Sequence, residues 1–523
     1  MGKRFPVNHP HPMRTSPRTA LVLTLSAAAC AATLTAPAQA APAPPAPALS
    51  WKPCTEGSGN SPGLECATLS VPMDYREPEG RKLDLAVSRL RSDRPSARRG
   101  TLLVIAGGPG TSGVDRLAAK GPTLRQRTGG SYDLVSIDPR GVGRSTKADC
   151  GLTADDREMT HLRSWPAPDG DIGGNVTRAR RVAAACERNG GDLLRSFTTA
   201  NEARDIDLFR QALGEEKLSA WGMSYGTYVG AVYAQKFPQR TDRWVLDSSA
   251  DPDPSHVAHG WLTGMAAAAE DRFPDFAAYA ADPARDAAHR VAERPEDVRP
   301  AFLALARQLD GAPREFARTE QEKRDGTPHF PLTGNRLRQG LQQALYSDGS
   351  FERLAALVVA ARDTTGPLTV PDVLPGTPLT QDQAAVSIGV ICNDVNWPRS
   401  VAAYARATAA DRARHPLTAG MPANITPCAF WKGGATEKPT RVTDRGPSNI
   451  LMVQNLRDPA TPHRGGLKMR AALGDRARLV TVDSGGHGAY LAHGNACGDG
   501  LVTNFLTTGS RPERDVTCPA ETG

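Results

Sequence analysis

The chain of 523 residues has no apolar run long enough to cross a membrane. The longest, from Ala20 to Leu34, has about fifteen residues, below the ~20 that a membrane-spanning helix needs. Basic residues precede this run, and the small residues Ala38 and Ala40 follow it, a pattern typical of a secretory signal peptide. We therefore expect no membrane span, a signal peptide over residues 1–40, cleavage after Ala40 and a secreted protein.

Blocks of lysine and arginine are also missing from the sequence. The formal net charge is +7, and loss of the signal, which carries four basic and no acidic residues, leaves +3. A weakly basic surface of mixed sign does not indicate nucleic-acid binding. We expect no nucleic-acid partner.

Cysteine is scarce, and neither a C-x-x-C nor a His-x-x-x-His spacing occurs, so no metal site is expected. Of the nine cysteines, Cys30 lies in the signal; its alternative use as a lipoprotein anchor lacks the usual leucine three places earlier, where Ala27 stands. The other eight form an even set, as in disulfide-bonded exported proteins. Closing short loops is the simplest of many connectivities, and it predicts four pairs: Cys54–Cys66, Cys150–Cys186, Cys392–Cys428 and Cys497–Cys518.

Strand-like and helical patterns divide the chain into regions. Residues 41–50 form a Pro/Ala tract that leads into the fold, and six β-type runs follow within 51–250. Helical patterns such as 199–214 separate the later runs, which predicts a mostly parallel sheet covered on both faces. Residues 251–440 are helical in character, and two more strand-like runs follow in 441–523. We predict an α/β fold with a helical cap inserted between its sixth and seventh strands, over the strand edge where such sheets bind ligands.

The most informative motif surrounds a serine. Gly222-Met223-Ser224-Tyr225-Gly226 matches G-x-S-x-G, between a strand-like run and a helical pattern. The turn is so tight that only glycine fits two places before and two places after the serine. Such a turn holds the Ser224 hydroxyl away from the sheet and lets the Tyr225 N–H point at a developing oxyanion. The alternative is a glycine-rich turn with an idle serine.

A serine hydroxyl becomes a nucleophile only with a base to take its proton and a carboxylate to orient that base. Asp458 follows the seventh predicted strand, and His487 follows the eighth, between glycines. Each lies at the carboxyl end of its strand, the edge at which Ser224 emerges. We predict that these three residues form a catalytic triad.

Three other residues compete for the roles of base and carboxylate. His463 precedes the last predicted strand, and His493 falls in a segment that can already be helical. Asp483 is only four residues from His487 and ends the strand itself. We expect all three to be structural or surface residues.

The loop after the third predicted strand, "VIAGGPGTSGVD", is expected to supply a second oxyanion donor from Gly107 or Gly108, and Gly108 is the preferred candidate. Residues 108–113 also satisfy the dinucleotide pattern G-x-G-x-x-G, with Asp138 at the end of the next strand. Pro109 removes an N–H from any phosphate cradle, and a secreted protein meets little NAD. We therefore expect no cofactor.

The stretch "DPRGVGRS", Asp138 to Ser145, predicts a structural turn. Asp138 and Arg140 are expected to brace the active-site loops, with a substrate contact as the alternative.

From Trp51 to Cys518 the chain resembles the secreted bacterial tripeptidyl aminopeptidases, relatives of the proline iminopeptidases among the α/β-hydrolase serine peptidases. The motifs that carry the resemblance are "GGPGTSG", "DPRGVGRS", "WGMSYGTYVGAVYAQKFP", "VLDSSADP", "CNDVNWP", "DPATP" and "GGHG". The resemblance implies an α/β-hydrolase fold, a TAP-like C-terminal region over 441–523, and Ser224, Asp458 and His487 as nucleophile, orienting acid and base. It also implies peptide substrates with a free N-terminus, from which short peptides, expected to be tripeptides, are released.

An exopeptidase needs a group that pairs with the substrate ammonium and a structure that blocks longer chains. Asp394, in the predicted cap beside Cys392, is a candidate partner for the ammonium; a solvated or capping carboxylate is the alternative. Three other functions stay open: an esterase or lipase, a single-residue aminopeptidase like proline iminopeptidase, and a secreted binding protein with an inactive triad.

Overall fold

The computed structural model describes residues 48–54, 61–326, 328–369, 373–374 and 377–521. The predicted signal peptide, its cleavage site, Cys30 and most of the Pro/Ala tract lie outside these ranges. Within them, no helix combines the length and the apolar character that a bilayer crossing requires.

A ten-stranded sheet forms the centre, in the order β1-β2-β3-β5-β4-β6-β7-β8-β9-β10. The first three strands and the β3–β5 pair are antiparallel, and every pair from β5 to β10 is parallel. Strands β2 to β9 are the eight predicted ones, and short strands β1 and β10 extend the two edges. The bounds are Lys52–Pro53 (β1), Leu64–Pro72 (β2), Lys82–Leu90 (β3), Gly100–Ile105 (β4), Tyr132–Ile137 (β5), Leu218–Met223 (β6), Thr241–Asp247 (β7), Ile450–Arg457 (β8), Ala477–Gly485 (β9) and Val516–Cys518 (β10).

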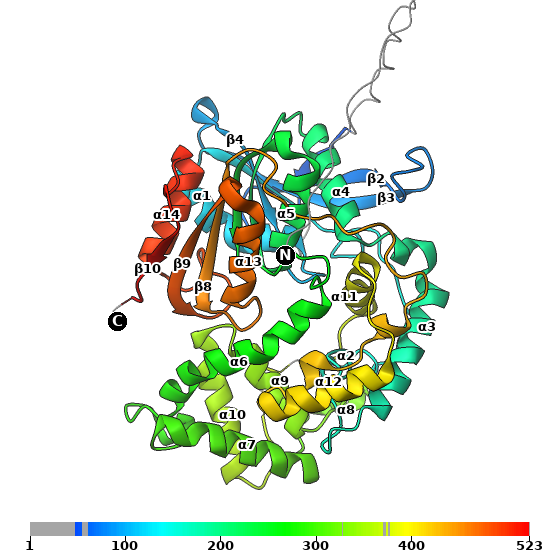
Figure 1. The fold of residues 1–523 in the computed structure, drawn as a ribbon, viewed down its shortest axis with the longest axis vertical. Helices are drawn as coiled ribbons and strands as arrows, with labels where there is room; N and C mark the ends of the chain where they lie inside the picture. The colour runs from blue at the N-terminus through cyan, green and yellow to red at the C-terminus, as the bar shows by residue number, and fades with distance from the viewer. Residues whose placement is uncertain (1–47, 55–60, 327, 370–372, 375–376, 522–523) are drawn as a thin grey trace, which may run out of the picture. The chain divides into compact units, whose positions relative to one another are not determined.

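Helices cover both faces of the sheet and bury its central strands on both sides. Apolar side chains of α1 (Gly113–Arg127) and α14 (Ala496–Thr508) pack on one face. Those of α4 (Thr199–Ala212), α5 (Tyr225–Lys236) and α13 (His463–Leu473) pack on the other. Figure 1 shows α14 and α13 on opposite sides of β8 and β9. The predicted α/β fold with a mostly parallel sheet is confirmed.

A helical insertion separates β7 from β8, the sixth and seventh predicted strands. In Figure 1 its helices α6, α7, α9 and α10 lie together beside the sheet, next to β8. They bury an apolar core of their own, which includes Phe276, Phe302, Leu337 and Leu354. The helices of the insertion are His259–Ala280 (α6), Pro295–Gly311 (α7), Glu320–Arg324 (α8), Gly334–Ala344 (α9), Phe351–Asp363 (α10), Gln381–Asp394 (α11) and Val401–Arg414 (α12).

Two helices pack differently from what their place in the chain suggests. Helix α3 (Gly173–Arg195) follows the short α2 (Met159–Leu162) within the range predicted as core, yet it packs on α11 and on residues 427–430 of the insertion. In turn, α11 places Ala384, Val386 and Ile388 in the apolar cluster of the sheet. Sheet and insertion are therefore joined through α3 and α11.

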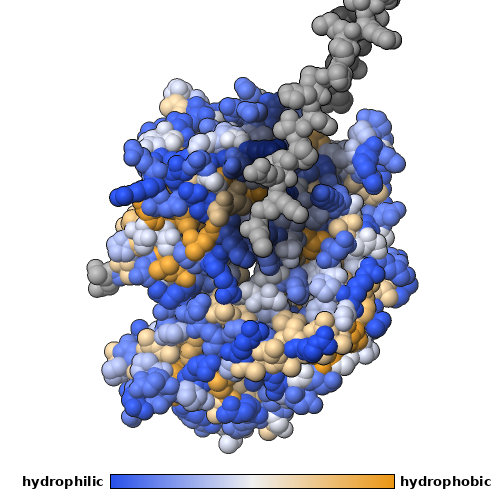
Figure 2. Space-filling model, viewed as in Figure 1, coloured by the Kyte–Doolittle hydropathy of each residue, from blue (hydrophilic) through white to orange (hydrophobic). Residues whose placement is uncertain are grey.

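Four disulfides are present, with the pairs Cys54–Cys66, Cys150–Cys186, Cys392–Cys428 and Cys497–Cys518. They fit an oxidising, extracellular compartment. Hydrophilic residues predominate on the face shown in Figure 2, with scattered apolar patches. Among the described residues, only Leu456 and Leu467 are large apolar side chains counted as exposed.

Candidate active site

Ser224 occupies the sharp turn between β6 and α5. Its φ of +60° lies in the left-handed region, which non-glycine residues rarely adopt, so the turn is strained. A Cβ on Gly222 would lie 2.5 Å from the carbonyl oxygen of Gly226, and one on Gly226 would lie 2.6 Å from that of Ile105. Both contacts are shorter than any real Cβ tolerates. The turn that presents the serine therefore requires glycine at both places.

Asp458 and His487 meet at the carboxyl ends of β8 and β9. The His487 Nδ1 lies 3.0 Å from Oδ2 and 3.1 Å from Oδ1 of Asp458. The carboxylate is almost fully buried and also accepts hydrogen bonds from the N–H groups of Ala460 and Thr461 and from the Thr461 hydroxyl. It is held in place by three donors besides the imidazole.

The charges of this pair stabilise each other. Burial on its own acts to raise the pKa of Asp458, but the His487 ring and the N–H donors outweigh it and hold that pKa below its usual value. Burial likewise acts to lower the pKa of His487, and the Asp458 carboxylate outweighs it, so the pKa of the imidazole is raised. The pair is an ionised carboxylate next to a base that binds a proton more readily than free histidine.

The loop that carries His487 is tied to the end of β7. The buried Asp247 accepts hydrogen bonds from the N–H groups of Ala489 and Tyr490, and the Ser248 hydroxyl accepts one from the N–H of Gly488. These bonds hold the loop over the serine turn.

The two halves of the site lie against each other. A Cβ on Gly488, the residue after His487, would lie 3.0 Å from the sulfur of Met223, the residue before Ser224. Within the described residues, no hydrogen bond joins the Ser224 hydroxyl to the His487 ring. Such a bond is often long in an enzyme without substrate and shortens on binding.

The insertion contributes Tyr346, which sequence reasoning missed. Its carbonyl oxygen accepts the His487 N–H at 2.9 Å, and its ring packs edge-on against the imidazole with 5.0 Å between centroids. The residues around Tyr346 in the sequence do not indicate this contact, because the contact arises only from the packing of the insertion on the sheet.

The glycine-rich loop after β4 passes directly over the serine. A Cβ on Gly107 would lie 3.0 Å from the Cβ and 3.5 Å from the Oγ of Ser224. Gly108 has a φ of +113°, and a Cβ there would lie 2.5 Å from the N of Gly110. The absence of a side chain on Gly107 thus lets this backbone approach the serine, as expected for an oxyanion loop.

The turn predicted to brace the loops does so. Asp138 accepts hydrogen bonds from the hydroxyl of Ser112 and from the N–H groups of Val114 and Arg144. The buried Arg140 forms a bidentate ion pair with Asp205 and donates to backbone carbonyls at the end of β2. Asp138 thus holds the far end of the glycine-rich loop to the end of β5, and Arg140 holds its own turn to α4 and β2.

In the part of the chain that the structure describes, none of the three competing residues forms a hydrogen bond or ion pair with Ser224, Asp458 or the His487 ring, and two of them have other partners. His463 begins α13, and its Nε2 lies 3.1 Å from the Thr481 hydroxyl; Asp483 pairs with Arg457 at 2.8 Å. The suggestion that His493 is helical is wrong, because α14 begins only at Ala496. His493 lies in a bend before α14. Its ring packs against Gly486, where a Cβ would lie 2.6 Å from the His493 ring.

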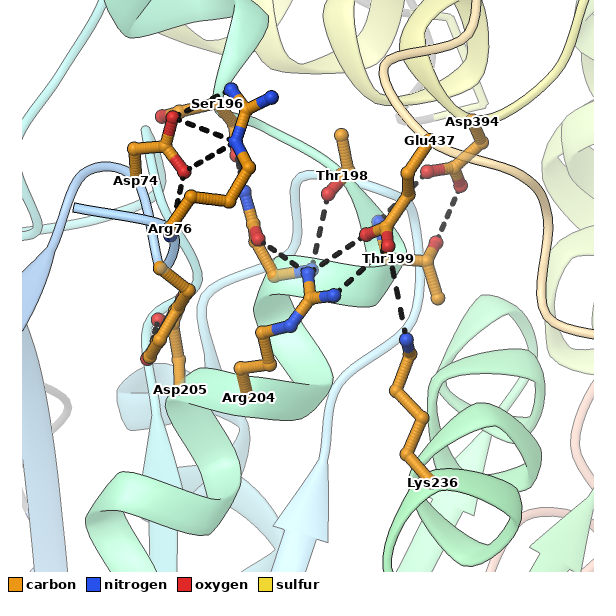
Figure 3. A network of polar contacts seen from close by, with 12 residues as sticks. Asp74, Arg76, Ser196, Thr198, Thr199, Arg204, Asp205, Lys236, Asp394 and Glu437 are labelled. Atoms are coloured by element: carbon orange, nitrogen blue, oxygen red, sulfur yellow. Dashed lines mark hydrogen bonds and ion pairs between the residues drawn. The ribbon is translucent and has the colours of Figure 1, made fainter. Parts of the chain in front are cut away.

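Asp394 is the predicted partner of the substrate ammonium, and Figure 3 shows its carboxylate directed at Thr199. The N–H and hydroxyl of Thr199 donate to it at 2.8 and 2.5 Å, and the same hydroxyl lies 2.7 Å from that of Tyr225. Burial raises the pKa of Asp394 to about 7. Asp394 is therefore a partly exposed carboxyl held by Thr199, whose hydroxyl also contacts Tyr225, the residue after Ser224. It lines a cavity of about 20 Å³ that has room for about one water.

Removal of the Thr461 hydroxyl tests how the carboxylate is held. Thr461→Val deletes one charge-assisted hydrogen bond to Asp458, so we expect kcat to fall roughly 10-fold. Thr461→Ser keeps the hydroxyl and is expected to retain near wild-type kcat. A Thr461→Val enzyme with unchanged kcat and a lowered Tm would show that the bond serves stability only.

A parallel sheet with helices on both faces, and a serine on a strained strand-to-helix turn beside a buried Asp–His pair, define the class: this is a serine hydrolase of the α/β-hydrolase fold. Residues 415–518 match the family described as "TAP-like protein". The chain is 31% identical to "Tripeptidyl aminopeptidase" of Streptomyces coelicolor, over 90% of this chain and 86% of that protein. It belongs to the tripeptidyl aminopeptidase family of serine peptidases.

Two further relatives have different names. "Serine protease Hip1" of Mycobacterium tuberculosis is 29% identical, over 90% of this chain and 91% of that protein. "Carboxylesterase B" of the same organism is 32% identical, over 90% and 89%. Similar identity thus extends to proteins named for peptide and for ester hydrolysis.

Proposed function

We propose that this protein is a secreted serine exopeptidase that releases short peptides, expected to be tripeptides, from free N-termini. The observation that carries the proposal is the Asp458–His487 pair, which lies beside the strained turn that presents Ser224. Similarity to relatives named for peptidase activity supports peptides as the substrates.

The proposed reaction is acyl transfer in two steps. Ser224 attacks the scissile carbonyl while His487 takes its proton, and Asp458 keeps the imidazole in the tautomer that accepts it. N–H groups of Gly108 and Tyr225 stabilise the oxyanion. His487 then protonates the leaving amine, and a water activated by the same imidazole releases the acyl group. The residues named here supply every proton transfer.

The insertion is proposed to set the exopeptidase character. It reaches the site through Tyr346, whose ring and carbonyl contact His487, so it lies where a substrate must enter. Packing of α11 on the sheet and on α3 holds that arrangement, which is proposed to admit a chain end rather than the middle of a long polypeptide.

A panel of peptidyl anilides tests this function. Mono-, di- and tripeptidyl anilides, each with a free and an acetylated amine, are compared with a short-chain nitrophenyl ester. We expect the free tripeptidyl anilide to have the highest kcat/KM. A preference for single residues would assign an activity like that of proline iminopeptidase, and a preference for the ester would assign the alternative that "Carboxylesterase B" supports.

Asp394→Asn tests the recognition of the free amine. If the carboxylate pairs with the substrate ammonium, the variant should raise KM for peptides with a free amine by roughly 10-fold and leave acetylated ester substrates unaffected. Kinetics with both substrate types measure the difference. Equal losses on both substrates would mean that Asp394 serves only to anchor Thr199 and Tyr225.

Secretion is part of the proposal. The four disulfides are compatible with it, and N-terminal sequencing of the exported protein tests the expected cleavage after Ala40. A mature chain that keeps Cys30 in lipid-modified form would support the lipoprotein alternative instead.

A further inference from the structure

A second polar cavity lies in the helical insertion, apart from the serine site. It has a volume of about 150 Å³, several times what one water needs. Helices α7, α9 and α12 and the segment 166–168 enclose it. Its charged lining residues are Arg307, Asp310, Arg338 and Arg412.

The charges around this cavity do not balance. Asp310 is the single carboxylate in the lining, and it pairs with Arg338 at 3.2 Å. Neither Arg307 nor Arg412 forms an ion pair with any described residue; Arg412 donates only to the carbonyls of Ala167 and Pro168. Three guanidinium groups thus face one carboxylate.

Arg338 is the most constrained of the three. Its residue is 8% exposed, and its Nε is buried with no hydrogen-bond partner. Burial lowers the pKa of Arg338, since no second carboxylate compensates for the lost hydration. Arg338 lines the cavity together with Arg307 and Arg412, so an anion bound there would place negative charge beside a guanidinium group that has lost hydration.

We propose that this cavity binds a small tetrahedral dianion, a phosphate or sulfate group. Guanidinium groups match the spacing of such oxygens with paired N–H donors. Two positive charges in excess of the lining carboxylate balance an ion of charge −2. The bound anion would connect α7, α9 and α12. Arg338 lies on α9, and Tyr346 follows the end of that helix, so a bound anion would stabilise the insertion near the serine site.

Isothermal titration calorimetry of the full-length secreted protein tests the site. Sodium phosphate, sodium sulfate and sodium acetate are titrated at constant ionic strength. We expect saturable one-site binding of phosphate and sulfate and much weaker binding of acetate. Arg307→Gln and Arg412→Gln should each weaken phosphate binding roughly 10-fold. Arg307 is exposed and lacks an ion pair, so its variant should fold normally.

Arg414→Gln is the matched control, because Arg414 lies on the same helix as Arg412 but is exposed and outside the cavity. It should bind phosphate as the wild type does. Three results would overturn the proposal: no saturable binding, acetate binding as tight as phosphate binding, or equal weakening by Arg414→Gln and Arg307→Gln. The last would indicate general attraction to a basic surface. Ester hydrolysis by each variant confirms that it is folded.

Discussion

Ser224→Ala is expected to abolish hydrolysis, with kcat lower by roughly 10⁶-fold. The hydroxyl on the strained turn is the atom proposed to attack the carbonyl, and alanine offers nothing in its place. A fluorophosphonate probe, which labels an activated serine covalently, should modify the wild-type protein at Ser224 and leave the variant unlabelled. Mass spectrometry of the labelled peptide identifies the site.

Ser484→Ala is the matched control for this experiment. Ser484 lies near the end of β9 at the same sheet edge, and its hydroxyl donates only to the carbonyl of Gly485. The control should retain labelling and kcat. Labelling of Ser224→Ala at another serine, or a kcat that survives the substitution, would refute the proposed nucleophile. If no serine is labelled in the wild-type protein either, the result would favour a secreted binding protein.

Asp458→Asn is expected to lower kcat by roughly 10⁴-fold, with little change in structure. The asparagine amide accepts hydrogen bonds through its oxygen only, whereas its NH₂ group donates them. The imidazole can therefore adopt the tautomer that cannot take the serine proton. The charge that stabilises protonated His487 is lost as well. Labelling by fluorophosphonate should slow in parallel, because it depends on the same proton transfer.

The pH profile checks the same pair. Because His487 must be neutral to act as base and its pKa is raised, kcat/KM should rise with pH through a midpoint above 6.5. Removal of the Asp458 charge removes the strongest influence that raises this pKa. In Asp458→Asn, the acid limb of the remaining activity should therefore move to lower pH.

Asp483→Asn is the matched control, since Asp483 lies four residues before His487 and pairs with Arg457. We expect it to change kcat by less than about 3-fold and to leave the acid limb in place. If Asp483→Asn and Asp458→Asn have similar effects, the assignment of the orienting carboxylate is wrong.

Local geometry explains why much of this site is predictable. The serine turn needs glycine at 222 and 226 for reasons contained in five consecutive residues, and the structure gives the clashes that any Cβ would make. Asp458 and His487 are predicted from the strand topology, because the carboxyl ends of parallel strands lie at the same edge of the sheet. Neither inference required knowledge of side-chain packing.

Packing between distant segments accounts for the rest. Tyr346 contacts His487 from a loop that follows α9, and nothing in its neighbourhood of the chain specifies that contact. Asp394 is predicted to be a surface or binding carboxylate, yet it is only partly exposed and accepts hydrogen bonds from Thr199 at the start of α4. The arginine cavity likewise joins α7, α9 and α12 with a segment that precedes α3.

The amino-acid sequence by itself indicated the class of fold and the strained serine turn, and it predicted Asp458 and His487 as partners of the serine and four short-range cysteine pairs. Each of these inferences depends on short-range geometry or on strand direction. Only the tertiary structure decided how the insertion meets the site, which carboxyl groups are buried and where unpaired arginines gather. Those features depend on which helix faces pack together, and that is set by the burial of apolar surface over the whole chain.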